Sequence, residues 1–96
     1  EASYAQIAPH LYCGPIEGAA NIQLSTCTPN FLILEGIQRW DGFHAEILKK
    51  PIRWDSGFVI PPTEPGLGVE LDEVVALANP YNETALHLEM SDKPIF

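Results

Sequence analysis

An uninterrupted apolar run, Phe31 to Leu34, is followed at once by a carboxylate, Glu35, and then by Gly36. A half-exposed strand alternates apolar and polar residues, whereas a parallel strand buried on both faces is apolar throughout. A segment with helical spacing precedes the run, and a short strand-like stretch, residues 4–9, precedes that segment. Strand, helix and strand within about 30 residues are typical of a βαβ unit with a right-handed crossover, so the predicted fold class is α/β.

The helix of this unit is predicted to begin at Pro15, because a proline at the first helical position loses no hydrogen bond. It is predicted to end before Pro29, since the residue before a proline avoids the α region. Its predicted inward face, which would pack on the sheet, consists of residues that recur at helical spacing: Ile16, Ala19, Ala20, Leu24 and Cys27.

Two residues with catalytic potential, His10 and Glu35, follow the two predicted strands. Because both strands of a βαβ unit run in the same direction, their C-terminal ends lie at one edge, with neighbouring strands about 4.8 Å apart. Ligands and catalytic groups gather at that edge in parallel α/β folds, whether open or closed into a barrel. Taken alone, each of the two is better interpreted as an ordinary loop residue. Together they favour a candidate catalytic pair.

The remainder of the chain is less regular. Asp55, Ser56 and Gly57 predict a hairpin turn, and Asp72 is a predicted N-cap for a helix that ends at Asn79. The further expectations are a short helix or strand over 44–51, hairpin arms within 52–60, a Pro/Gly loop over 61–68, a helix over 73–79 and a weak last strand over 85–90.

Several other motifs are weaker evidence for a function. The sequence over 66–71 has two glycines but lacks the third of a dinucleotide fingerprint, and no convincing strand precedes it. Residues 82–84 form a glycosylation sequon, and Trp40 and Trp54 are interpreted as packing residues. Four side chains could supply zinc ligands by type, but their spacing matches no zinc pattern: His10, Cys13, Cys27 and His44.

The composition of the chain argues against some classes of binding partner. With a formal charge of −8 and only five Lys plus Arg among 96 residues, the chain is a poor match for nucleic acid or an anionic membrane surface. No apolar stretch approaches the roughly 20 residues that span a bilayer. Two cysteines are too few for a disulfide scaffold, so reduced thiols and a cytoplasmic location are expected. A core-like pattern that starts without an initiator Met indicates a piece of something longer.

Residues 7–35, IAPHLYCGPIEGAANIQLSTCTPNFLILE, and residues 65–73, PGLGVELDE, carry a resemblance to a known family. The chain resembles the C-terminal part of the mandelate racemase and muconate lactonizing enzyme group of the enolase superfamily. Within it, the chain is most similar to sugar-acid dehydratases of the galactonate dehydratase type and to related cycloisomerases. The resemblance implies a C-terminal fragment of a modified TIM-type (β/α) barrel. Residues 1–35 would supply strand 7, helix 7 and strand 8, and residues 36–96 an extension returning towards an N-terminal capping domain.

The resemblance also implies a function. It implies a magnesium-dependent enzyme that removes the proton beside a sugar-acid carboxylate and forms an enediolate, most simply a dehydratase, alternatively a cycloisomerase or racemase. By resemblance, His10 is a general base or acid oriented by an Asp on the sixth strand. Glu35 would hydrogen-bond or protonate the substrate carboxylate, and a protonated Glu35 would need burial to raise its pKa.

No residue of this chain is assigned as a metal or cofactor ligand, because the implied Mg²⁺ ligands lie on strands outside it. The implied partners are the rest of the barrel, the capping domain and a small sugar-acid substrate, with assembly as a homo-oligomer. A second hypothesis is that the 96-residue chain, taken alone, is catalytically silent and only a structural or interaction piece.

Overall fold

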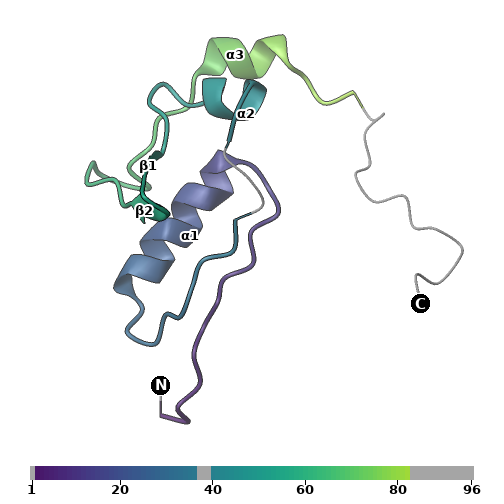
Figure 1. Cartoon of the computed structure of the whole chain (residues 1–96). Coiled ribbons are helices and arrows are strands. Elements are labelled where there is room, and N and C mark those ends of the chain that lie inside the picture. The colour runs from purple at the N-terminus through teal and green to yellow at the C-terminus, as the bar shows by residue number, and fades with distance from the viewer. Residues whose placement is uncertain (1, 37–39, 83–96) are drawn as a thin grey trace, which may run out of the picture.

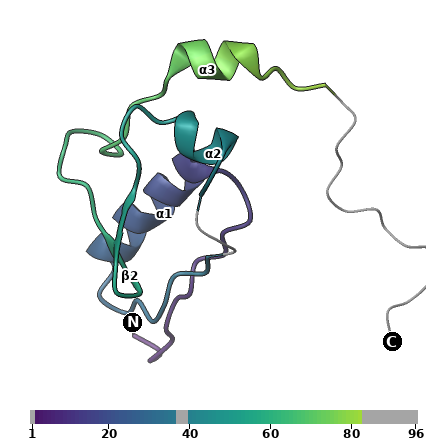
Figure 2. The same cartoon turned by 45° about the horizontal axis from the view of Figure 1, so that its top comes forward.

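The computed structural model describes residues 2–36 and 40–82 and combines helices with a small antiparallel sheet. The elements in chain order are α1 (Pro15–Cys27), α2 (Phe43–Glu46), β1 (Arg53–Asp55), β2 (Phe58–Ile60) and α3 (Glu73–Ala78) (Figure 1). In both views the hairpin of β1 and β2 lies beside the C-terminal half of α1, while α2 lies near its N-terminal end (Figure 2). No helix within the described ranges is long and apolar enough to cross a membrane.

Two extended segments on either side of α1 in the sequence run next to each other in the same direction (Figure 1). Ile7 and Phe31 form a parallel bridge, and the N–H of Ile7 and of Leu32 donate at 3.0 and 2.8 Å to the carbonyls of Asn30 and Ile7. The next donor in this pattern would be residue 9, and Pro9 has no N–H. The predicted parallel direction is therefore confirmed, but the pairing is an isolated bridge rather than a regular ladder.

Helix α1 begins at Pro15, as predicted, directly after the N-cap Gly14. The predicted inward face is largely wrong. Ala19 is buried, whereas Ile16 and Leu24 are 43% and 50% exposed and Cys27 is exposed. The buried face is the adjacent one, comprising Pro15, Gly18, Ala19 and Ile22. Both faces have helical spacing, and the side chains that cover α1 come from distant parts of the chain, which spacing cannot reveal.

Trp40 covers α1 at Gly18, and its ring also packs on Trp54 with centroids 5.8 Å apart. A Cβ at position 18 would overlap the Cζ2 and Cη2 atoms of Trp40. We therefore expect Gly18→Ala to destabilise the protein by about 1–3 kcal/mol, as overpacking of a tight contact does.

Denaturant unfolding of the full-length protein measures this effect. Gly14→Ala is the control for steric overlap, because a Cβ there would lie 3.7 Å from Nδ1 of His44, an ordinary contact, and its remaining cost is that of alanine at an N-cap. Equal stabilities of the Gly18→Ala variant and the parent would show that the contact between Trp40 and α1 is loose.

The apolar run after α1 is less buried than predicted. Leu32 and Ile33 are 58% and 62% exposed, while Phe31 and Leu34 are half-buried. One side of this segment pairs with the stretch around Ile7, and a cavity of about 620 Å³ lies between the segment, α1 and the hairpin. Burial on both faces is thus not provided by the residues that the structure describes.

The second half of the chain follows the predictions more closely. Asp55 pairs with Phe58, so Ser56 and Gly57 form a two-residue turn with φ of 49° and 87°, as in a type I′ hairpin. The side chain of Asp72 accepts hydrogen bonds from the first turn of α3, and residues 61–68 form a loop. Of residues 44–51, only residues 44–46 are helical, as part of α2, while Leu48 forms an isolated antiparallel bridge with Leu71. The expected strand over 85–90 lies outside the described residues.

Candidate active site

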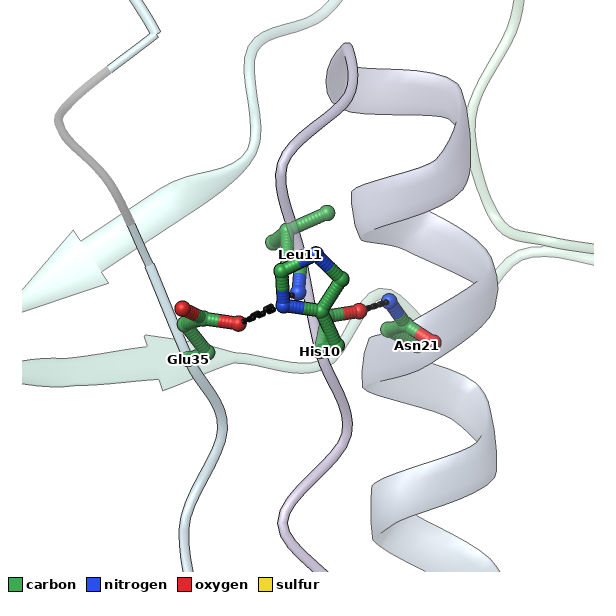
Figure 3. A network of polar contacts seen from close by, with 4 residues as sticks. All are labelled: His10, Leu11, Asn21 and Glu35. Carbon is green, nitrogen blue, oxygen red and sulfur yellow. Dashed lines mark hydrogen bonds and ion pairs between the residues drawn. The ribbon is translucent and has the colours of Figure 1, made fainter. Parts of the chain in front are cut away.

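The parallel pairing brings His10 and Glu35 together at one edge, as predicted. The N–H of Glu35 donates to the carbonyl of Pro9 at 3.3 Å, which aligns the ends of the two segments. From these ends the two side chains turn towards each other, and Nδ1 of His10 contacts Oε2 of Glu35 (Figure 3). The side chains are 77% and 49% exposed, so the pair is open on one side.

Two further contacts hold the backbone at this pair. Oε2 of Glu35 also accepts a hydrogen bond from the N–H of Leu11 at 3.0 Å. The side-chain amide of Asn21, on α1, donates to the carbonyl of His10 at 3.0 Å (Figure 3). Asn21 was not among the residues predicted from the sequence. The available signal was its place on α1, the helix that crosses between the two segments, but spacing alone does not show which side chain reaches back to residue 10.

The electrostatics of Glu35 differ from the sequence expectation. The hydrogen bond from Leu11 N–H is the main cause that lowers the pKa of Glu35, and the hydrogen bond and charge of His10 lower it further. Desolvation opposes this shift but does not outweigh it. A Glu35 that gives a proton to substrate would need a raised pKa. Within this chain the carboxyl is instead held in its ionised form, because two donors converge on one oxygen and the side chain stays half-exposed.

This direction is directly measurable. We expect the pKa of the Glu35 carboxyl in the full-length protein to lie below its ordinary value of 4.5. A pH titration monitored by ¹³C NMR measures it. Because the folded pKa is lowered, the interaction stabilises the fold above that pH and is lost as the pH falls through the lowered pKa. His10→Asn should leave most of the shift, since Leu11 is the larger cause. Titration above 4.5 would mean that burial by other parts of the protein dominates.

The ionised carboxylate assigns the tautomer of His10. A carboxylate can only accept hydrogen bonds, so the ring nitrogen that faces it, Nδ1, carries a proton. In the neutral ring Nε2 then holds a lone pair. Nε2 has no hydrogen-bond partner among the described residues, and the exposed ring leaves it accessible. Nε2 of His10 is therefore the atom of this pair that is placed to take a proton from a bound molecule.

The described residues do not make a metal site. They contain no group of three or more His, Cys, Asp or Glu side chains that could hold a metal ion. Cys13 and Cys27 are exposed and form no disulfide in the part of the chain that the structure describes. A hydrogen bond to Glu17 raises the pKa of Cys13.

Comparison with known proteins assigns the chain to a family. Residues 1–75 match the family model described as enolase C-terminal domain-like. A crystal structure assigned to the mandelate racemase/muconate lactonizing enzymes, from Burkholderia SAR-1, superposes with a TM-score of 0.85 and 59% identity, covering 99% of this chain and 24% of that one.

Two curated relatives are sugar-acid dehydratases by name. D-galactonate dehydratase from Verminephrobacter eiseniae is 35% identical over 80% of this chain and 22% of its own. D-gluconate dehydratase from Thermoproteus tenax is 27% identical over 100% of this chain and 19% of its own. The chain thus spans about a fifth of the length of the curated relatives it matches. It belongs to the enolase C-terminal domain-like family, in the mandelate racemase/muconate lactonizing enzyme group of the enolase superfamily.

Proposed function

We propose that the full-length protein containing this chain is a lyase that dehydrates a sugar acid, and that His10 moves the proton beside the carboxylate. The observation that carries the proposal is the contact between His10 Nδ1 and Glu35, which leaves Nε2 as an accessible base. The names of the dehydratase relatives support the substrate class. In this proposal residues 4–9, α1 and residues 31–34 are strand 7, helix 7 and strand 8 of a TIM-type barrel.

The chemistry that this chain supplies is proton transfer. Nε2 of His10 takes the proton from C2 of the sugar acid, and the electron pair of the broken C–H bond passes into the enediolate. The imidazolium that forms is stabilised through Nδ1–H by the charge of Glu35, which lies in contact with it. An acid then protonates the C3 hydroxyl group, and the enediolate expels this group as water. A second role for Glu35, contact with the substrate carboxylate, follows from the family resemblance.

Magnesium, when bound, would stabilise the negative charge on the substrate. The described residues do not fit a magnesium site. The magnesium ligands are proposed to come from other parts of the polypeptide. The Asp that would orient His10 is proposed to come from there as well. The other proposed partners are the capping domain, reached by residues 36–96, and further copies of the protein in a homo-oligomer located in the cytoplasm.

An isomerase of the same superfamily is the second candidate, and the crystal structure from Burkholderia favours it by name. A racemase or cycloisomerase would use the same C2 proton transfer without losing water. The 96-residue chain alone is expected to be inactive in either case.

The test is a panel of sugar acids, including D-galactonate and D-gluconate, incubated with the full-length protein in D₂O. Formation of a 2-keto-3-deoxy acid would support dehydration. Deuterium at C2 without loss of water would favour the isomerase. Absence of both reactions across the panel would contradict proton transfer at C2 of sugar acids by this protein.

A further inference from the structure

The peptide unit between His10 and Leu11 is held at both of its polar ends. Its carbonyl oxygen, on His10, accepts from the side-chain amide of Asn21 at 3.0 Å. Its N–H, on Leu11, donates to Oε2 of Glu35 at 3.0 Å. The two contacts come from opposite sides, one from α1 and one from the end of the neighbouring segment (Figure 3). This peptide plane is therefore fixed against rotation in both directions.

The peptide unit before His10 is held as well. The carbonyl of Pro9 accepts from the N–H of Glu35 at 3.3 Å, and the proline ring limits φ at residue 9. The Cα of His10 thus lies between two restrained peptide units. Since the imidazole extends from this Cα and is held again at Nδ1 by Glu35, the backbone contacts and the contact at Nδ1 together decide where Nε2 lies.

We propose that Asn21 is a positioning residue for His10. This inference rests on the proposed function, in which Nε2 of His10 is the base. Among the residues that the structure describes, Asn21 is the one on α1 that hydrogen-bonds to His10, so it ties the base to the helix that crosses between the paired segments. The other polar contacts described above, at Pro9, at the ring of His10 and at Leu11, are made by Glu35. Without Asn21 the peptide keeps its N–H contact but can tilt about it, and Nε2 moves with it.

The geometry also fixes the orientation of the Asn21 amide. A backbone carbonyl only accepts, so the group facing it must be the NH₂ of the side chain. Asn21→Asp preserves the shape but replaces this donor with a carboxylate oxygen that faces the carbonyl of His10. It changes hydrogen bonding with little change in volume but adds a negative charge, so it is compared with Asn21→Ala, which removes the donor and adds no charge.

In the full-length protein we expect Asn21→Asp to lower kcat and the rate of C2 deuterium exchange together, by about 10- to 100-fold. A displacement of about 1 Å at a reacting group costs up to that much. KM for the sugar acid should change by less than about 3-fold, because Asn21 contacts the base and the proposal gives it no contact with the substrate.

Gln23 provides the matched control. It lies on the same helix and also donates from its side-chain amide to a backbone carbonyl, that of Pro62 at 3.1 Å. Gln23→Ala removes a comparable contact to a loop remote from His10. It is expected to lower Tm while leaving the exchange rate per folded molecule unchanged.

The outcomes separate this inference from the proposed function. If Asn21→Asp lowers only Tm, and exchange stays within about 2-fold of the parent, Asn21 is merely structural and the inference is wrong. The proposed function survives that result as long as His10→Asn abolishes exchange, and it fails if His10→Asn does not. Should Asn21→Asp not fold, Asn21→Ala, which adds no charge near Glu35, is judged by the same comparison of exchange, kcat and KM.

Discussion

Replacing His10 with asparagine in the full-length protein is expected to lower turnover by about 10²–10⁴-fold, the usual contribution of a positioned acid or base. Asparagine retains some of the size of the imidazole and can still donate to Glu35. It has no atom that takes up a proton near neutral pH. Exchange of the C2 proton with deuterium should fall in parallel, because the same atom of His10 performs both. Steady-state kinetics and NMR of the recovered substrate measure the two rates.

His44→Asn is the matched control for this substitution. His44 lies on α2, where its ring packs near Phe43 with centroids 5.5 Å apart, and it contacts neither His10 nor Glu35. Turnover of this variant should remain close to that of the parent. If His10→Asn retains more than about a tenth of the exchange rate, another group removes the proton and His10 is not the base.

The juxtaposition of His10 and Glu35 was predictable because it depends on chain direction more than on packing. Pro15 at the start of α1 and the apolar run before Glu35 define two parallel segments joined by a helix. Once the segments are parallel, residues that follow them must meet at one edge, and His10 and Glu35 do so. Even a pairing reduced to one bridge by Pro9 keeps this alignment, because alignment requires only a shared direction and register.

The buried face of α1 was not predictable for the opposite reason. Ile16 and Leu24 are larger and more apolar than Gly18, so hydrophobic spacing favoured the wrong side. The buried side is chosen by Trp40, which needs a residue without a side chain beneath its ring. Such a contact between residues far apart in sequence leaves no periodic signal.

The charge state of Glu35 shows a similar limit. The resemblance implied a glutamate that can share a proton with substrate, which requires a raised pKa. The lowered pKa arises mainly from one backbone donor, Leu11 N–H, that lies 24 positions away along the chain. Every residue except proline has a backbone N–H, so the residue types do not show which one approaches Glu35. Its approach to Glu35 follows only from the fixed peptide unit between His10 and Leu11.

Glu35→Gln is expected to lower kcat by about 10²-fold with little change in KM. Glutamine keeps the shape and can still accept from Leu11, but it removes the negative charge. That charge matters most once proton transfer has begun, when His10 becomes an imidazolium and charge develops on the substrate. An interaction that strengthens only in the transition state affects kcat and leaves KM largely unchanged. Steady-state kinetics of the full-length variant measure both constants.

Glu70→Gln is a suitable control. Glu70 is also a carboxylate in an ion pair, with Lys49, and it is exposed, but it lies away from His10. It should leave turnover unchanged. If Glu35→Gln raises KM and leaves kcat alone, Glu35 binds substrate and its proposed catalytic role is wrong.

A double substitution separates the two proposed catalytic roles of Glu35. If Glu35 acts through the imidazole, its charge has no effect once His10 is asparagine. The variant with both His10→Asn and Glu35→Gln should then be no slower than His10→Asn alone, because residues that act as a unit are strongly non-additive. If Glu35 instead contacts the substrate carboxylate, the two losses should multiply. The contact between Nδ1 and Oε2, together with the lowered pKa of Glu35, favours the first result.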